Sequence, residues 1–141
     1  MGLRGAGAKK LVASKSQPTH WGQKRYRVAR INAFLQSLPI TKGILAGQNL
    51  RLLRGQRKFI KDVYGDVAKD GRRRVKLAIK SEPRGNGKTG FIAGLALCHL
   101  LGPESEMRGE IYSCAYSKQQ AALIFAEMKA ILDEKDPSYA D

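Results

Sequence analysis

Apolar residues recur at three- and four-residue spacing in three parts of the chain, and this spacing predicts three amphipathic helices. The first predicted helix begins at Tyr26 and stops at Pro39, because proline cannot continue a helix. The second follows Gln56 and breaks near Gly65 or Gly71, and the third opens at a capping box, Ser117–Gln120. The apolar positions that carry the pattern are Val28, Ile31, Phe34, Leu35 and Leu38, then Phe59, Ile60, Val63 and Tyr64, then Leu123, Ile124, Met128, Ile131 and Leu132.

Two other segments have the pattern of strands. Val75, Leu77 and Ile79 alternate with polar residues, and residues 110–115 form a β-rich run of strand length. An apolar run without proline lies between them and is ended by Gly102-Pro103, so it predicts a further helix. Strand, helix, strand and helix with short connections predict parallel, right-handed βαβ packing. The predicted fold class is therefore α/β, a partial parallel sheet preceded by a helical basic extension.

A glycine-rich loop joins the first predicted strand to its helix. Residues 81–87 read Ser-Glu-Pro-Arg-Gly-Asn-Gly, and Lys88 and Thr89 follow at the start of the helix. This order is that of a phosphate-binding P-loop, in which backbone N–H groups and the lysine contact phosphates and the hydroxyl contacts Mg²⁺. Glu82 stands where the usual motif has its first glycine. The alternative is a glycine-rich turn before an ordinary helix, and the flanking strand and helix patterns favour the P-loop.

Asp133 and Glu134 follow Ala130-Ile131-Leu132 and imitate a Walker B motif, in which carboxylates follow a buried strand. The apolar residues continue the spacing of the preceding capped helix, so both carboxylates are predicted in the last turn of a helix. The chain then has the phosphate-binding half of an ATPase site and no recognisable catalytic carboxylate.

The charge is strongly asymmetric. The formal net charge is +14, and residues 1–60 contain 13 of the 26 basic residues and none of the 12 acidic ones. Such a basic half fits contact with a polyanion such as nucleic acid, and charge alone favours this no more than a solvated arm without a partner. Cys98 and Cys114 lack metal-ligand spacing and are predicted to be small buried residues. No apolar run is long enough to span a bilayer, which favours a soluble, intracellular chain.

Several segments together indicate a family. They are Met1–Gly5, Ala46–Leu52, Gln56–Gly65, Pro83–Thr89 and Ala115–Ala121. In this combination the chain resembles the N-terminal part of the large terminase subunit of tailed bacteriophages, over about residues 25–132. In that family the Walker A motif commonly lacks its first glycine and has an arginine before Gly-Asn-Gly-Lys, so the resemblance explains Glu82.

The resemblance implies a function and a set of site residues. The complete subunit would hydrolyse ATP to translocate double-stranded DNA into the procapsid, and it would cut the DNA with a nuclease domain. Gln56 would contact adenine, and Arg84 would act as an arginine supplied in cis that stabilises charge on the γ-phosphate. The remaining ATP-binding residues would be Gly85, Asn86, Gly87, Lys88 and Thr89, with Thr89 also holding Mg²⁺ through its hydroxyl.

The implied organisation has three parts: a disordered basic arm at 1–24, a helical extension with the adenine-side segment at 25–74, and an incomplete P-loop ATPase core at 75–141. We expect a truncated piece that is inactive by itself, whereas the complete subunit would form a homo-oligomeric ring with portal and small-terminase partners in the host bacterial cytoplasm, without a membrane. Other P-loop proteins, a helicase-like nucleic-acid motor above all, and a non-enzymatic basic DNA-binding fragment are the alternatives.

Overall fold

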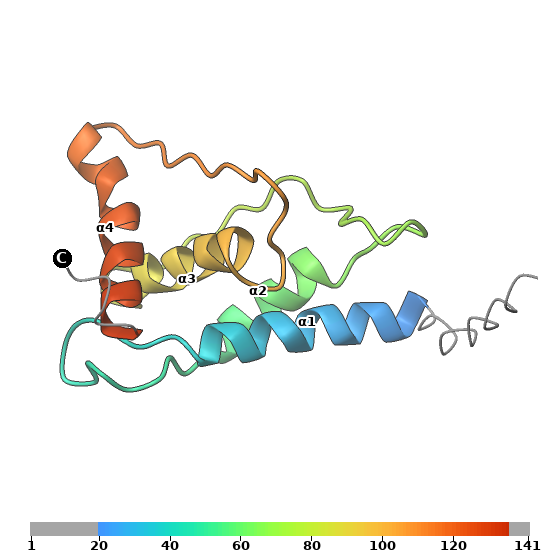
Figure 1. The fold of residues 1–141 in the computed structure, drawn as a ribbon, viewed down its shortest axis with the longest axis horizontal. Helices are drawn as coiled ribbons and strands as arrows, with labels where there is room; N and C mark the ends of the chain where they lie inside the picture. Colours follow the sequence, from blue (N-terminus) through green and yellow to red (C-terminus); the bar gives the residue numbers. More distant parts are fainter. Residues whose placement is uncertain (1–19, 136–141) are drawn as a thin grey trace, which may run out of the picture.

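The computed structural model describes residues 20–135, with side chains from residue 25 onward, and contains four helices in that range. They are α1 (His20–Gln36), α2 (Arg54–Tyr64), α3 (Lys88–Leu100) and α4 (Lys118–Lys135). Helices α1 and α3 lie along the length of the molecule, and α4 stands across one end (Figure 1). All four predicted helices are confirmed. Helix α1 starts six residues earlier than Tyr26, and the rest of the predicted arm, residues 1–19, lies outside the described range.

The predicted parallel sheet is wrong. Within residues 20–135 the only β pairings are two isolated antiparallel bridges, Pro39 with Asn49 and Val67 with Arg73. The segments expected as strands, residues 75–79 and 110–115, are neither helical nor paired with each other. They run as extended connections on one side of the molecule (Figure 1). The described fold is helical rather than α/β.

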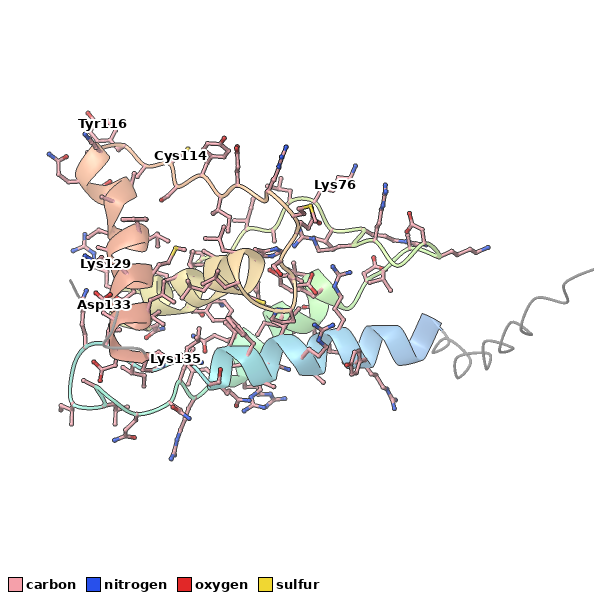
Figure 2. The ribbon with its side chains drawn as sticks, viewed as in Figure 1. Lys76, Cys114, Tyr116, Lys129, Asp133 and Lys135 are labelled. Atoms are coloured by element: carbon pink, nitrogen blue, oxygen red, sulfur yellow. The ribbon has the colours of Figure 1, made fainter. Side chains whose placement is uncertain are left out.

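The reason is that alternation favours a strand only when one face of the strand is covered and its backbone is paired. Here Leu77 and Ile79 are 80% and 86% exposed, and Tyr112 is 80% exposed. A helix closes its hydrogen bonds within itself, but a strand needs a neighbouring strand for each N–H and C=O group. Cys114 lies in the second of these segments and is exposed (Figure 2), so its predicted burial is wrong, whereas Cys98 in α3 is buried.

One apolar core holds the helices together. Helix α3 packs on both α1 and α4, and α2 packs on α1. The largest side chains that are fully buried come from α1, α2 and α3 and are Ile31, Leu35, Ile60, Phe91, Leu97 and Cys98. Burying a large apolar side chain of this kind stabilises a fold by roughly 1.5–3 kcal/mol, so this core fixes the direction in which α3 points. In the described range, no helix is both long and apolar enough to cross a membrane.

A glycine sets the distance between α1 and α3. A Cβ atom placed on Gly94 of α3 would lie 2.9 Å from Leu35 Cδ2 and 3.2 Å from Leu38 Cδ1. Both leucines belong to the buried cluster, so they have little room to withdraw. The absence of a side chain at Gly94 is what allows α1 to approach this closely.

We predict that Gly94→Val destabilises the fold by about 1–3 kcal/mol, because the added methyl groups overpack the contact between α1 and α3. The free energy of unfolding from urea titration measures the change. Gly55→Ala is the control, because a Cβ atom there meets nothing within 4 Å, and it should be neutral or slightly stabilising. Equal stability of Gly94→Val and the parent chain would contradict the close packing of these helices.

Candidate phosphate-binding site

Two glycines of the loop before α3 have left-handed backbone angles. Gly85 and Gly87 have positive φ angles of 87° and 67°, and Gly87 is the residue that precedes the first turn of α3. Side-chain-bearing residues rarely adopt these angles. No side chain caps the start of α3, and its first turn contains no acidic residue. The first N–H groups of a helix have no acceptor inside the helix, so here they face the loop with the positive end of the helix dipole.

Lys88 lies within reach of this loop. Its Nζ atom donates hydrogen bonds to the backbone carbonyls of Glu82 and, at 3.0 Å, of Pro83. The ammonium group is therefore folded back over the loop and is held by carbonyl oxygens, which an anionic phosphate oxygen can replace. Arg84, Asn86 and Thr89 are exposed beside it. The predicted residues 84–87 therefore lie in the loop, and Lys88 and Thr89 are the first two residues of α3.

Gln56 lies in the first turn of α2 and is only 3% exposed. Its Oε1 atom accepts a hydrogen bond from the backbone N–H of Leu53 at 3.0 Å, so the side chain caps the start of α2. One turn later, Phe59 meets Phe91 edge to face, with ring centroids 6.0 Å apart. This ring contact is where side chains of α2 and α3 meet. Gln56 itself is buried one turn before Phe59, so the structure does not place its side chain on the surface beside the loop.

Asp133 and Glu134 do not follow a strand, as the carboxylates of a Walker B motif would. Both lie in α4, which continues to Lys135, so their prediction as residues of a helix end is confirmed; Figure 2 labels Asp133 and Lys135 in this helix. Glu134 lies instead near the turn after α1, where its Oε1 atom is 3.7 Å from a Cβ atom built on Gly47. In the described part of the chain, no group of three or more metal-ligating side chains (His, Cys, Asp or Glu) is brought together.

The sequence analysis missed Glu127, a buried carboxylate on the inner side of α4. It is 7% exposed, accepts a hydrogen bond from the Thr41 hydroxyl and forms an ion pair with Lys42 at 3.0 Å. Its Oε1 atom is 3.9 Å from a Cβ atom built on Gly90, in the first turn of α3. Glu127 thus joins α4 to the turn after α1, directly behind the start of α3.

The pKa of Glu127 reflects this environment. Burial raises the pKa of this carboxyl, but the hydrogen bond from Thr41 and the interaction with Lys42 lower it by more. The net pKa is therefore below the ordinary value for glutamate. A carboxylate with a lowered pKa stabilises the folded chain above its unfolded pKa. That contribution is lost as the pH falls through the folded pKa.

A second polar cluster lies at the other end of α3, away from the loop. Arg27 Nε donates to both carboxylate oxygens of Glu104, at 2.8 and 2.9 Å, and the Tyr64 hydroxyl lies 2.9 Å from His99 Nε2. Burial raises the pKa of Tyr64 to about 12 and lowers that of His99. A cavity of about 810 Å³ beside the cluster is lined by basic and acidic side chains alike. The cluster joins α1, α2 and the end of α3.

Comparisons with known proteins point to one family. Over 100 residues, or 70% of this chain, the sequence is 43% identical to the terminase large subunit of Enterobacteria phage HK97, of which it covers 19%. The solved structure of the HK97 bacteriophage large terminase matches 79% of this chain at 36% identity with a TM-score of 0.66, and the match covers 22% of that structure. The chain thus spans about a fifth of the length of these relatives. No family model matches it.

We predict that Glu127→Gln lowers the free energy of unfolding at neutral pH by about 1–2 kcal/mol, because the charged acceptor of Thr41 and Lys42 is lost. The difference from the parent chain should shrink as the pH falls through the folded-state pKa of Glu127, which lies below the ordinary value for glutamate, because the side chain then becomes neutral. Urea titrations at a series of pH values measure it. Glu134→Gln, the same change at an exposed position of the same helix, is the control and should alter the stability little. A pH-independent effect of Glu127→Gln would contradict the role given to this carboxylate.

Proposed function

We propose that this chain, which is related to the large terminase subunit of tailed bacteriophages, binds ATP through the loop at residues 84–89 and the start of α3. Support comes from the identity with the HK97 subunit and from a loop whose geometry suits phosphate groups. The observation that carries the proposal is the placement of Lys88. It is the first residue of α3, and its ammonium group lies over a loop with two glycines of positive φ.

We propose a role for each site residue, and for Gln56 and Arg84 this role comes from the resemblance to the terminase family. The Lys88 ammonium exchanges the carbonyls of Glu82 and Pro83 for phosphate oxygens, and the free N–H groups at the start of α3 donate to the same anion. Thr89 offers its hydroxyl to Mg²⁺, which neutralises phosphate charge when it is bound. Gln56 contacts adenine with its NH₂ group, since its oxygen holds the Leu53 N–H. Arg84 is exposed beside the loop and stabilises charge on the γ-phosphate.

For the longer protein we propose the activity of a DNA-packaging motor. It would hydrolyse ATP, translocate double-stranded DNA into a procapsid and cut it, as a homo-oligomeric ring in the host cytoplasm that meets the portal and the small subunit. The 141-residue chain alone would bind ATP without appreciable turnover, because phosphoryl transfer needs carboxylates placed at the nucleotide. Asp133 and Glu134 lie in α4, and Glu127 is held by Thr41 and Lys42.

Double-stranded DNA is the proposed polyanionic partner of the basic half. Between residues 25 and 65 the chain has nine basic side chains and a single acidic one, Asp62. Arg54, Arg57, Lys58 and Lys61 occupy the exposed side of α2. Such groups would contact DNA phosphates and not base edges. The affinity for DNA would therefore be independent of base sequence and would fall steeply as the salt concentration rises.

We predict that Lys88→Ala weakens the binding of Mg²⁺-ATP by about 10–100-fold, because a charged donor to phosphate oxygens is lost. Titration calorimetry on the purified chain measures this, and a urea titration shows whether the variant is as stable as the parent. Lys61→Ala, which removes one exposed charge from α2, should bind ATP as the parent does. Undiminished ATP affinity in a folded Lys88→Ala chain would refute the phosphate-binding assignment.

A further inference from the structure

An ion pair lies at the start of the glycine-rich loop, residues 81–87, that precedes α3. Lys80 Nζ is 2.6 Å from Glu82 Oε1, and the two side chains are 15% and 17% exposed. Glu82 is the residue that stands in place of the first glycine of the common P-loop motif. The glutamate that replaces this glycine therefore forms a specific ion pair with Lys80.

Lys80 also connects the loop to the helices. Its ammonium group lies 5.3 Å from the ring centroid of Phe59 in α2 and 5.6 Å from that of Phe91 in α3. These distances are those of cation–π contacts. The two rings pack on each other, so Lys80 is held against the contact between Phe59 of α2 and Phe91 of α3. Through Lys80, the side chain of Glu82 is anchored to both helices.

The backbone of Glu82 belongs to the site itself, because its carbonyl is one of the two acceptors of Lys88 Nζ. The side chain of Glu82 thus pairs with Lys80, which lies against the two aromatic rings, and the backbone carbonyl of Glu82 accepts a hydrogen bond from Lys88. The position of that carbonyl fixes where the Lys88 ammonium lies when no phosphate is bound. A glycine in this place would leave the carbonyl without such an anchor.

Stability alone explains the pair poorly. A shielded ion pair gains little over apolar residues of similar volume, since both charges lose hydration. The other carboxylate oxygen, Glu82 Oε2, is buried without a hydrogen-bond partner, which adds a further cost. Polar groups that are costly to fold are expected where they position a functional site.

We propose that Lys80 and Glu82 are positioning residues that hold the phosphate loop in its binding conformation. This proposal rests on the proposed function, binding of ATP by the loop. The pair acts by fixing the backbone of Glu82 at the start of the loop, and neither side chain needs to touch the nucleotide. Breaking the pair leaves a loop that must be ordered at the moment of binding, and that ordering lowers the affinity.

The experiment compares Mg²⁺-ATP affinity by titration calorimetry for the parent chain and for Lys80→Met, Lys80→Arg and Glu82→Gly, with a urea titration of each. Lys80→Met keeps the length of the side chain and removes its charge, and its affinity should fall about tenfold, the cost of ordering one or two loop side chains. Lys80→Arg keeps a positive charge beside Glu82 and the two rings, so its affinity should fall less than that of Lys80→Met. Glu82→Gly restores the common motif and should nevertheless bind more weakly.

Lys76→Met is the matched control, since Lys76 is exposed four residues earlier in the same segment (Figure 2), and its affinity should equal that of the parent. If Lys80→Met lowers only the stability to urea while the folded chain binds ATP like the parent, the pair is structural and the proposal is overturned. Binding by Glu82→Gly as tight as that of the parent overturns it as well. A parent chain that binds no ATP would instead refute the proposed function on which the pair depends.

Discussion

The burial of helix α3 is the constraint on which the rest of the structure depends. Phe91 and residues 93–98 are buried, with α1 on one side and α4 on another. Gly94 lets α1 approach, and the apolar cluster leaves α3 little freedom to turn or slide. A loop can present its amides to a ligand only if the helix that follows it is fixed. The rigid α3 therefore determines where Gly87, Lys88 and the first free N–H groups point.

Much of the helical structure could be predicted from the sequence, because α1, α2 and α4 pack apolar residues that recur at helical spacing and α3 coincides with an apolar run without proline. Ile31 and Leu35, Ile60 and Val63, and Ile131 all lie on the expected inner faces. The strand pattern misled, because alternation at Val75, Leu77 and Ile79 describes a strand only when a partner covers it, and the exposed side chains show that none does within the described residues. Resemblance to the terminase family explained Glu82, but the pairing of Glu82 with Lys80 was missed.

The long-range contacts were beyond the reach of sequence patterns, since nothing local marks them. Thr41 and Glu127 are 86 residues apart, and their hydrogen bond depends on how α4 crosses the turn after α1. One signal for Glu127 was present: it shares a helical face with the apolar residues Ile124, Met128 and Ile131. A charged residue on an apolar face requires a partner when it is buried. The capping role of Gln56 likewise depends on where α2 begins.

The central claim is that the loop at residues 84–89 and the first turn of α3 form an anion site. The most direct test is to titrate the ¹⁵N-labelled chain with pyrophosphate and follow every backbone amide resonance. The account predicts that the largest shifts occur at residues 85–90, where unpaired N–H groups face the loop, while amides on the exposed sides of α2 and α4 stay in place. Shifts spread over the basic surface of α2, with residues 85–90 unmoved, would contradict it.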